Sequence, residues 1–596
     1  MALTAAQIED QKKQAEELLF SGPQQLGFAE GLFFGHFQAP LLFPYPQIDR
    51  ARQEETDRTV SAVKRFCDEQ IDAAAIDRNA AIPDTVVAGL GRLGVLGMTA
   101  PKECGGLGFS QYSNCRVMEV IGGHCSSTAV FVNAHHSIGI RALLLFGTEE
   151  QKRQWLPPLA SGAKLAAFAL TEPEAGSDAS NVQTTATPTP DGRSYVLNGT
   201  KRWITNGGIA GVLTVIARTP GTSGSKKKKE ITAFLVTPDM PGFKVLEQRM
   251  EKVGIRGTAT ARLAFENVVV PKENILGQVG KGLRIALTVL DFGRTTFGAS
   301  CTGAAKVCVQ AASTHAKKRV QFEQPLAEFE LVKKKIAWMA AHAFAMEAAT
   351  MQCAGCIDRG GHDYKLETAM LKVWSTEALW QIVNDTVQIW GGKAFFTDEP
   401  YERMMRDARL NQIGEGANDV LRAFIAMVGI KPVADSLLTV KNALSHPFAK
   451  IGTLLSFGGR EIVARLMPRL TTPNVPVQSP TLQPHARELA LRVREFGRAV
   501  QSMLFKHREE ILFRQYVQER LADAACELYA SSCTLSRLDQ LLTISNGNAA
   551  EAARDLMAGR YFLRLSDRRI RQCLAALNDN DDRYTTETAN AILERY

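Results

Sequence analysis

The chain has 596 residues, which is too long for one compact core, and ordinary domain sizes predict about three to four domains. Apolar residues make up 45% and charged residues 22%, the balance of a soluble globular protein, and no stretch reaches the roughly 20 uninterrupted apolar residues of a membrane-spanning helix. The net charge of +8 is modest, and its densest run, Lys226 to Lys229, lies in a loop-like stretch between two apolar runs, which argues against nucleic-acid binding.

The first fifty residues predict an N-terminal extension. Acidic residues come early, at Glu9, Asp10, Glu16 and Glu17, and no apolar signal core accompanies them. Transit peptides are poor in acidic residues, so this composition argues against one. We therefore expect residues 1–50 to be an extension and the protein to be cytoplasmic, in a bacterium; an organellar protein whose transit peptide has been removed would have the same composition.

Residues 51–165 have the apolar spacing of helices and predict an N-terminal helical domain. Within them, GLGRLG at 89–94 matches the dinucleotide-binding pattern GxGxxG. That pattern binds nucleotides only between a strand and a helix, whereas the residues before it start like a helix after Pro83. We therefore do not expect a Rossmann site at 89–94.

Residues 166–280 change to short β-rich runs broken by turns, such as YVLNGTKRWITN and GVLTVIART, and predict a middle β-domain. Two dipeptides in this region, Asp191-Gly192 and Asn198-Gly199, are typical of hairpin turns. We expect a hairpin at each of them.

Helical spacing returns after the β-rich region and predicts a bundle domain at 281–432 and an additional C-terminal helical domain at 433–596. Cys353 and Cys356 form a CxxC inside a helical stretch without a second pair, so we expect them to pack as small apolar side chains and not to bind metal. The helix–sheet–helix order predicts an α+β multidomain fold in which a small β-domain lies between helical domains.

The additional domain contains a Pro-rich stretch at 471–480, which we interpret as a linker. The segment 453–470 alternates apolar residues with Arg460, Arg465 and Arg469. A basic amphipathic segment can lie on an anionic bilayer, and it can equally pack between domains with solvated arginines. After the linker, apolar residues recur at helical spacing, at Leu489, Val493, Phe496, Val500 and Leu504.

Five sequence words occur in order along residues 60–430. They are GMTAPKECGGLGFS (97–110), FALTEPEAGSD (168–178), WITNGG (203–208), QIWGGKAF (388–395) and IGEGANDVLR (413–422). Together they resemble the acyl-CoA dehydrogenase family. The segments at 135–162, 290–294 and 319–329, and the extra C-terminal region, resemble its very-long-chain subgroup.

The resemblance implies an α+β multidomain fold with an N-terminal helical domain, a middle β-domain, a C-terminal four-helix bundle and an extra C-terminal helical domain. It also implies FAD-dependent α,β-dehydrogenation of an acyl-CoA thioester. Glu415 matches the base that takes the α-proton, a task for which a carboxylate is suited when water is excluded, because desolvation raises its pKa. Gly414 and Gly416 allow the backbone to pass close to substrate and cofactor. Some members place the base on the helix carrying LDFGR, but the matching residue here is Gly293, which has no carboxylate.

The resemblance also implies cofactor and substrate contacts. For FAD they are Phe168, Leu170, Thr171, Ser177, Trp203, Thr205, Arg319, Gln321, Phe322, Gln388, Gly391, Gly392, Ala417, Asn418 and Asp419; for the acyl-CoA substrate they are Ser177, Asp291, Arg294 and Gly416. Those at 319–322 and 388–392 resemble contacts that cross between protomers, which implies a homodimer or a dimer of dimers. The alternative for Asp291 and Arg294 is a helix-surface ion pair.

Two positions bear on cofactor and chain length. Ala417 stands where the family usually has a Thr hydroxyl that helps to hold the flavin, so the resemblance implies either somewhat weaker FAD binding or support from Asn418 and Asp419. Ala134 occupies a place where medium-chain members carry Glu at the pocket floor, and with Val130 one turn earlier it leaves room for a longer acyl chain.

Several functions remain open on this scaffold. The first is a long-chain or very-long-chain dehydrogenase that passes electrons to an electron-transfer flavoprotein. The second is an acyl-CoA oxidase, in which oxygen re-oxidises the flavin. The third is a non-enzymatic assembly factor or a nucleic-acid-binding flavoprotein, and the interspersed acids Glu488, Glu495, Glu509 and Glu510 weaken the nucleic-acid alternative.

Overall fold

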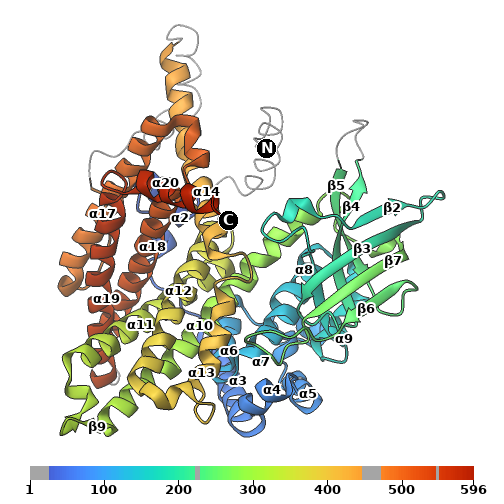
Figure 1. Cartoon of the computed structure of the whole chain (residues 1–596), viewed down its shortest axis with the longest axis horizontal. Helices are drawn as coiled ribbons and strands as arrows, with labels where there is room; N and C mark the ends of the chain where they lie inside the picture. Colours follow the sequence, from blue (N-terminus) through green and yellow to red (C-terminus); the bar gives the residue numbers. More distant parts are fainter. Residues whose placement is uncertain (1–25, 222–228, 446–471, 545–548) are drawn as a thin grey trace. The chain divides into compact units, whose positions relative to one another are not determined.

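The computed structural model of the chain describes residues 26–221, 229–445, 472–544 and 549–596 (Figure 1). It divides into two compact units. The first comprises Gln47–Arg359 and Ser375–Ala417, and the second comprises Pro23–Pro46, Gly360–Trp374 and Asn418–Tyr596. Residues 26–46 of the predicted extension thus belong, by their contacts, to the same unit as the C-terminal helices, and residues 47–50 belong to the first unit.

The first unit begins with helices, as predicted. The first of them is capped by Asp49, whose side chain accepts a hydrogen bond from the backbone N–H of Arg52. GLGRLG lies in and just after a helix, so the prediction of helix in place of a nucleotide loop is confirmed. The elements are α3 (Arg50–Gln70), α4 (Ala73–Asn79), α5 (Asp84–Arg92), η2 (Val95–Gly97), η3 (Lys102–Cys104), α6 (Gln111–His124), α7 (Ser126–Val132), the π-helix η4 (Asn133–Ile140), α8 (Arg141–Phe146) and α9 (Glu149–Ala160).

The continuous helical run Ser126–Phe146 is, within the described ranges, the one long and apolar enough to cross a membrane by length and composition. Two thirds of its most apolar window is buried inside the protein. Its side chains Ile138, Ile140 and Leu143 belong to a core shared with the sheet. The run is therefore buried like the core helix of a globular protein, and its polar residues lie in the protein interior.

The middle region forms an eight-stranded sheet in the order β6-β7-β3-β2-β4-β5-β8, with β1 parallel to β4. The Asp191-Gly192 hairpin is confirmed, because it joins the antiparallel strands β2 and β3. The strands are β1 (Ala166–Ala169), β2 (Thr185–Pro188), β3 (Ser194–Ile204), β4 (Val212–Pro220), β5 (Lys229–Val236), β6 (Phe243–Glu247), β7 (Ala261–Pro271) and β8 (Ile275–Leu276).

The hairpin expected at Asn198-Gly199 is wrong. Both residues lie inside β3, where the register against β7 shifts between Leu197 and Gly199. A Cβ on Gly199 would lie 2.5 Å from Thr184 Oγ1, and its φ is +154°. Gly199 therefore allows two segments of the chain to approach closely within the sheet. Close backbone approach is, besides a turn or a bulge, a common reason for a glycine in a strand.

The sheet is covered on one face by helices. Figure 1 shows α8 and α9 beside the strands, and their apolar side chains, including Leu143 and Leu156, share a buried cluster with Val212 and Ile216 of β4. A second cluster contains Leu197, Phe234 and Phe265 from the strands themselves. Burial on both faces explains why β4 and β5 read as nearly continuous apolar runs.

The helices after the sheet form the rest of the first unit, apart from the first turns of α12, which belong to the second. They are α10 (Gly282–Lys318), α11 (Glu330–Arg359), α12 (Lys365–Trp390), η8 (Gly391–Phe395) and α13 (Tyr401–Asn411), with the small ribbon β9 (Val320–Gln321) and β10 (Gln324–Pro325). Helix α10 packs on α6 and α11. Cys353 and Cys356 are buried on α11, in agreement with their expected packing role.

The second unit is helical within the residues described. Its elements are α2 (Phe28–Phe33), η1 (Ala39–Leu41), α14 (Asn418–Ser445), η9 (Pro480–Leu482), α17 (Gln483–His507), η10 (Arg508–Phe513), α18 (Gln515–Ile544), α19 (Ala549–Ala575) and α20 (Asp582–Leu593). Leu489, Val493, Phe496 and Val500 are buried along α17, as their spacing predicts. The basic segment 453–470 and Lys226 to Lys228 lie outside the described residues. The predicted α+β multidomain fold class is confirmed.

Candidate active site

Glu415, the predicted base, lies in the loop between α13 and α14. Its backbone is left-handed, with φ +59°, and Gly416 follows at +93°. The Cβ position of Gly293, on α10, lies 3.3 Å from Glu415 Oε2 and 3.1 Å from Ile138 Cγ1. Because Gly293 has no side chain, a space is left beside it, and the Glu415 carboxylate borders this space. Ile138 forms an apolar wall of the same space.

Asp291 and Arg294 form a buried ion pair on α10, with 3.1 Å between Oδ1 and Nη1. Arg294 Nε also donates to the backbone oxygen of Glu415, at 3.4 Å. The ion pair expected as the alternative is present, but it is buried and joined to the Glu415 loop. It therefore fixes the backbone that carries the carboxylate.

The π-helix η4 connects the space beside Glu415 and Gly293 to the sheet. Thr296 of α10 donates to Asn133 Oδ1 and lies 3.2 Å from Ser137 Oγ. At the other side of η4, His135 Nδ1 accepts from the backbone N–H of Ala166, the first residue of β1, at 2.9 Å. Burial lowers the pKa of His135 to about 4, so its ring is neutral. π-helical turns are frequent at functional sites, and sequence periodicity does not distinguish them from α-helix.

Ala134 and Val130, the residues considered for chain length, are partly buried, on η4 and on the α7 turn before it. They therefore lie on the same continuous helical run as Ile138, which lines the place beside Glu415. Helical neighbours on this run are the nearest candidates for the wall of an acyl channel.

The predicted flavin-contacting residues Thr171 and Trp203 are neighbours across two strand ends. The backbone N–H of Arg202 donates to Thr171 O at 3.0 Å. Trp203 has φ +58° and keeps 53% of its surface exposed, while the β3–β7 register shifts between Lys201 and Ile204. Leu170, Thr171 and Thr205 are partly buried, as is Phe168 on β1, whereas Ser177 is exposed.

Two residues that sequence reasoning missed lie beneath this loop. Lys201 Nζ and Glu172 Oε1 are 2.7 Å apart, and their side chains are 0% and 2% exposed. Burial lowers the pKa of Lys201 to about 8, against the opposing effect of Glu172. Burial alone raises the pKa of Glu172, but the Lys201 ammonium and several hydrogen bonds outweigh it and lower that pKa. Lysine and glutamate look like surface residues in sequence, so only the position of Glu172 inside TEPEAGSD was a signal.

A second group of predicted cofactor contacts lies at the adjacent ends of α10 and α12. His315 and Trp390 stack at 4.1 Å between ring centroids and join these two ends. Arg319, Gln321 and Phe322 follow α10, and Gln388, Gly391 and Gly392 are at the end of α12 and the start of η8. All six are exposed, Phe322 to 88%.

The three residues after Gly416 are divided between the units. Asn418 is buried in the second unit, where its Oδ1 accepts from Lys372 Nζ at 2.8 Å. Asp419 has a side chain that is 99% exposed and lies 3.5 Å from Arg422. Ala417 ends the first unit and is partly buried. The sequence word IGEGANDVLR therefore spans both units.

Comparison with known proteins assigns this architecture. Four sequence profiles match successive parts of the chain: acyl-CoA dehydrogenase N-terminal domain (residues 53–163), middle domain (167–268) and C-terminal domain (280–430), and the ACAD9/ACADV C-terminal domain (480–595). The mitochondrial very long-chain specific acyl-CoA dehydrogenase of Homo sapiens is 36% identical to this chain, and the match covers 93% of this chain and 84% of that protein. The chain belongs to the acyl-CoA dehydrogenase family.

Two further relatives agree with this assignment. The probable acyl-CoA dehydrogenase FadE10 of Mycobacterium bovis is 33% identical, over 98% of this chain and 91% of its own length. The crystal structure of an acyl-CoA dehydrogenase from Bacillus anthracis complexed with FAD superimposes with a TM-score of 0.76 at 26% identity, covering 94% of both chains. The predicted family, the oxidoreductase class and the FAD cofactor of this acyl-CoA dehydrogenase are therefore confirmed.

The residues present fit a flavin. A half-exposed Trp203 ring beside a hydrogen-bonded strand end is a surface that a flat aromatic group can cover. At the other group, Cβ positions on Gly391 and Gly392 have no atom of the described residues within 4 Å, and Arg319 offers a forked donor suited to phosphate.

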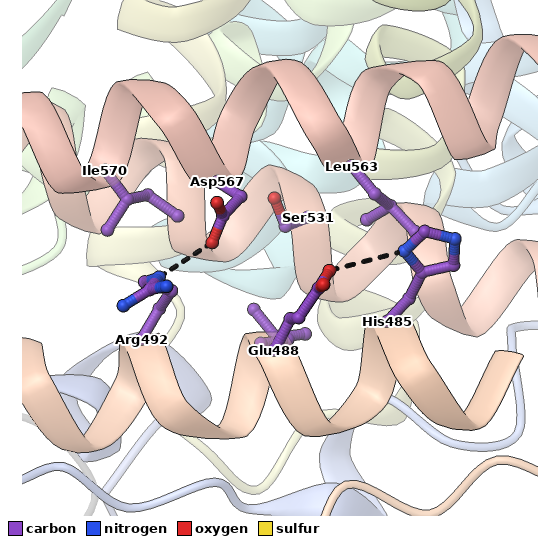
Figure 2. A pocket seen from close by; sticks show the side chains of 8 residues that line it. His485, Glu488, Arg492, Ser531, Leu563, Asp567 and Ile570 are labelled. Atoms are coloured by element: carbon purple, nitrogen blue, oxygen red, sulfur yellow. Dashed lines mark hydrogen bonds and ion pairs between the residues drawn. The ribbon is translucent and has the colours of Figure 1, made fainter.

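A small pocket in the second unit of the acyl-CoA dehydrogenase is a different feature. It lies among α17, α18 and α19, and Figure 2 shows Arg492 and Asp567 pointing toward each other across it. Arg492 Nε lies 2.7 Å from Asp567 Oδ1, and His485 Nδ1 lies 3.6 Å from Glu488 Oε2. Burial lowers the pKa of His485, so its ring is neutral, and among the lining residues the carboxylates of Glu488 and Asp567 outnumber the one cation, Arg492. The pocket therefore does not attract an anionic ligand such as an acyl-CoA.

Proposed function

We propose that this protein catalyses the FAD-dependent α,β-dehydrogenation of long-chain or very-long-chain acyl-CoA to trans-2-enoyl-CoA, as part of fatty acid β-oxidation, with Glu415 as the base. The observation that carries the proposal is the position of the Glu415 carboxylate beside the side-chain-free Gly293. Family membership supports the reaction class, and the very-long-chain name of the human relative supports the chain length.

The residues of the proposed active site have separate roles in the reaction. Bound FAD would supply the acceptor for the hydride that leaves the β-carbon. The Glu415 carboxylate takes the α-proton, and a position beside Ile138 and a packed helix reduces its contact with water, which favours proton abstraction at neutral pH. Arg294 and Asp291 hold the Glu415 backbone, so that the carboxylate is in place before substrate arrives.

The cofactor would be held by two groups of residues. Thr171, Trp203 and Thr205, with the backbone of Phe168 to Ser177, would hold the flavin ring. Arg319, Gln321, Phe322, Gln388, Gly391 and Gly392 would hold the adenine and pyrophosphate end. A ring that is 88% exposed in one chain, as Phe322 is, suits a contact completed by a second protomer, so we propose a homodimer or a dimer of dimers.

The remaining partners are proposed from the family resemblance. Electrons would leave to an electron-transfer flavoprotein. The proposed location, a bacterial cytoplasm, rests instead on the early acidic residues of the N-terminus. Peripheral membrane contact through 453–483 would suit poorly soluble substrates. Sedimentation with anionic vesicles, compared between the unaltered protein and a variant lacking 453–483, tests that contact. Equal sedimentation of the two proteins would exclude membrane contact through this segment.

Anaerobic titration of the purified yellow protein with acyl-CoAs of four to twenty carbons tests the main proposal. We expect loss of the flavin absorbance, most rapidly with the longer chains. Glu415→Gln should keep FAD and bind acyl-CoA but bleach more slowly by on the order of a thousandfold or more. Normal bleaching by that variant, or no bleaching by the unaltered protein with any chain length, would contradict it. Rapid re-oxidation in air would instead identify an oxidase.

A further inference from the structure

The backbone that carries the flavin-contacting residues is tied together by one buried lysine. Lys201 Nζ donates to Leu170 O at 2.9 Å and to Glu172 Oε1 at 2.7 Å. Between these two bonds, the Arg202 N–H donates to Thr171 O at 3.0 Å. Three consecutive residues of the loop are thus bonded to two consecutive residues of β3.

The Glu172 carboxylate extends the same network to the far end of the loop. Its Oε1 accepts from Thr184 N at 3.0 Å and from Thr184 Oγ1 at 2.5 Å, and its Oε2 accepts from Gln183 N at 2.5 Å. The loop 172–183 therefore begins and ends on one carboxylate. Because both oxygens accept and the ammonium donates twice, the two buried charges are compensated by hydrogen bonds.

Stability alone does not account for a pair buried so completely. Taking two charges out of water costs several kcal/mol per ion, and apolar residues of similar volume are often as stabilising as a buried ion pair. Trp203, two residues after Lys201, has the left-handed backbone that is unfavourable for a non-glycine residue and persists only when its surroundings enforce it. The bulge between Lys201 and Ile204 is where that conformation is set.

We propose that Lys201 and Glu172 are positioning residues that fix the spacing between Thr171 and Trp203, and through it the affinity for FAD and the surroundings of the flavin ring. This inference rests on the proposed flavin contacts of those two residues. It assigns a function to the pair that differs from a contribution to folding.

The test compares a double variant with a matched control pair. Lys201→Met/Glu172→Gln removes both charges and keeps the side-chain volumes. The control pair is Lys306 of α10 and Glu119 of α6, whose Nζ and Oε1 are 2.5 Å apart; because Lys306 Nζ also lies 3.0 Å from Glu347 Oε2, the control variant Lys306→Met/Glu119→Gln/Glu347→Gln removes all three charges. For each apoprotein we would measure the melting temperature, the dissociation constant for FAD by fluorescence quenching, and the visible spectrum of the bound flavin.

We expect the Lys201/Glu172 double variant to melt close to the unaltered apoprotein, yet to bind FAD at least roughly tenfold more weakly with a shifted flavin spectrum. The control pair should leave the FAD constant and the spectrum unchanged. An FAD constant and spectrum like those of the unaltered protein, or a weakening matched by the control pair, would overturn the positioning role. If the unaltered protein itself takes up no FAD, the proposed function fails instead.

A second variant keeps the proposal testable if the double variant does not fold. Thr184→Val removes one hydrogen bond to Glu172 and retains both charges. We expect it to fold and to weaken FAD binding by about two- to fivefold, the effect of one net hydrogen bond. An unchanged FAD constant in Thr184→Val would count against the role.

Discussion

The Cβ position of Gly293 on α10 lies 3.3 Å from Oε2 of Glu415. The two residues therefore share one place, approached from two different segments of the chain. A carboxylate can reach this place from either backbone, and this relation leads directly to the first prediction.

Moving the carboxylate from position 415 to position 293 should restore part of the activity. Glu415→Gly removes the base and relieves the left-handed backbone, and adding Gly293→Glu supplies a new one. Ile138, 3.1 Å from the new Cβ, must yield by a few tenths of an ångström. We expect the double variant to bleach on the order of a hundredfold faster than Glu415→Gly alone, yet more slowly than the unaltered protein. Gly293→Gln in the same background is the control, and equal rates in the two would show that the carboxylate is misplaced.

Breaking the buried pair on α10 should destabilise the first unit. Arg294→Met leaves Asp291 buried without its partner cation, at a cost of about 3–5 kcal/mol. Asp291→Asn/Arg294→Met removes both charges and should recover most of the loss. Calorimetric melting of the three proteins measures this order. Were the single variant to melt as high as the unaltered protein, the pair would not be isolated from solvent as described.

The second unit should lose stability as pH rises, through Glu367. Its Oε1 accepts from the backbone N–H of Ala29 at 2.8 Å, and burial raises its pKa to about 8. Because the folded pKa is above the unfolded value near 4.5, its contribution is fully present below about pH 4.5 and is lost as pH rises through 8. Glu30, with a pKa raised by burial to about 7, acts in the same direction.

Glu367→Gln should therefore be more stable than the unaltered protein at pH 8.5 by about 2–5 kcal/mol and nearly equal to it at pH 5. Thermal melting at the two pH values measures the difference. Glu510→Gln, an exposed carboxylate of the same unit paired with Arg514, is the control and should change little at either pH. A pH dependence that persists unchanged in Glu367→Gln would assign it to other groups.

A charge at Ala134 should shorten the preferred acyl chain. Ala134→Glu adds volume and a carboxylate to the helical run that lines the place beside Glu415, and an unpaired charge against an apolar chain is costly. We expect the ratio of bleaching rates for sixteen- and eight-carbon substrates to fall at least roughly tenfold, with Ala134→Ser close to unaltered. If both variants keep the original ratio, the floor of the channel lies elsewhere.

The sequence predicted most of the fold and the residue types of the site. Apolar periodicity distinguished the helices of both units from the β-rich middle region, because 3.6- and 2-residue repeats are local properties. It also predicted a helix after Pro83 in place of a nucleotide-binding loop, and α5 confirms that helix. The hairpin expected at Asn198-Gly199 was wrong, since a glycine that admits a neighbouring strand has the same local signature as one that turns the chain.

What the sequence by itself determined is the family, the α+β order and Glu415 as the candidate base, all carried by short words read locally. Only the tertiary structure decided that Gly293 borders that carboxylate, that Arg294 bonds a residue 121 positions away, and that Lys201 is buried on Glu172. The physical reason is that such contacts depend on where the chain returns in space. A charged residue looks solvated in sequence until its partners and its burial are fixed by packing.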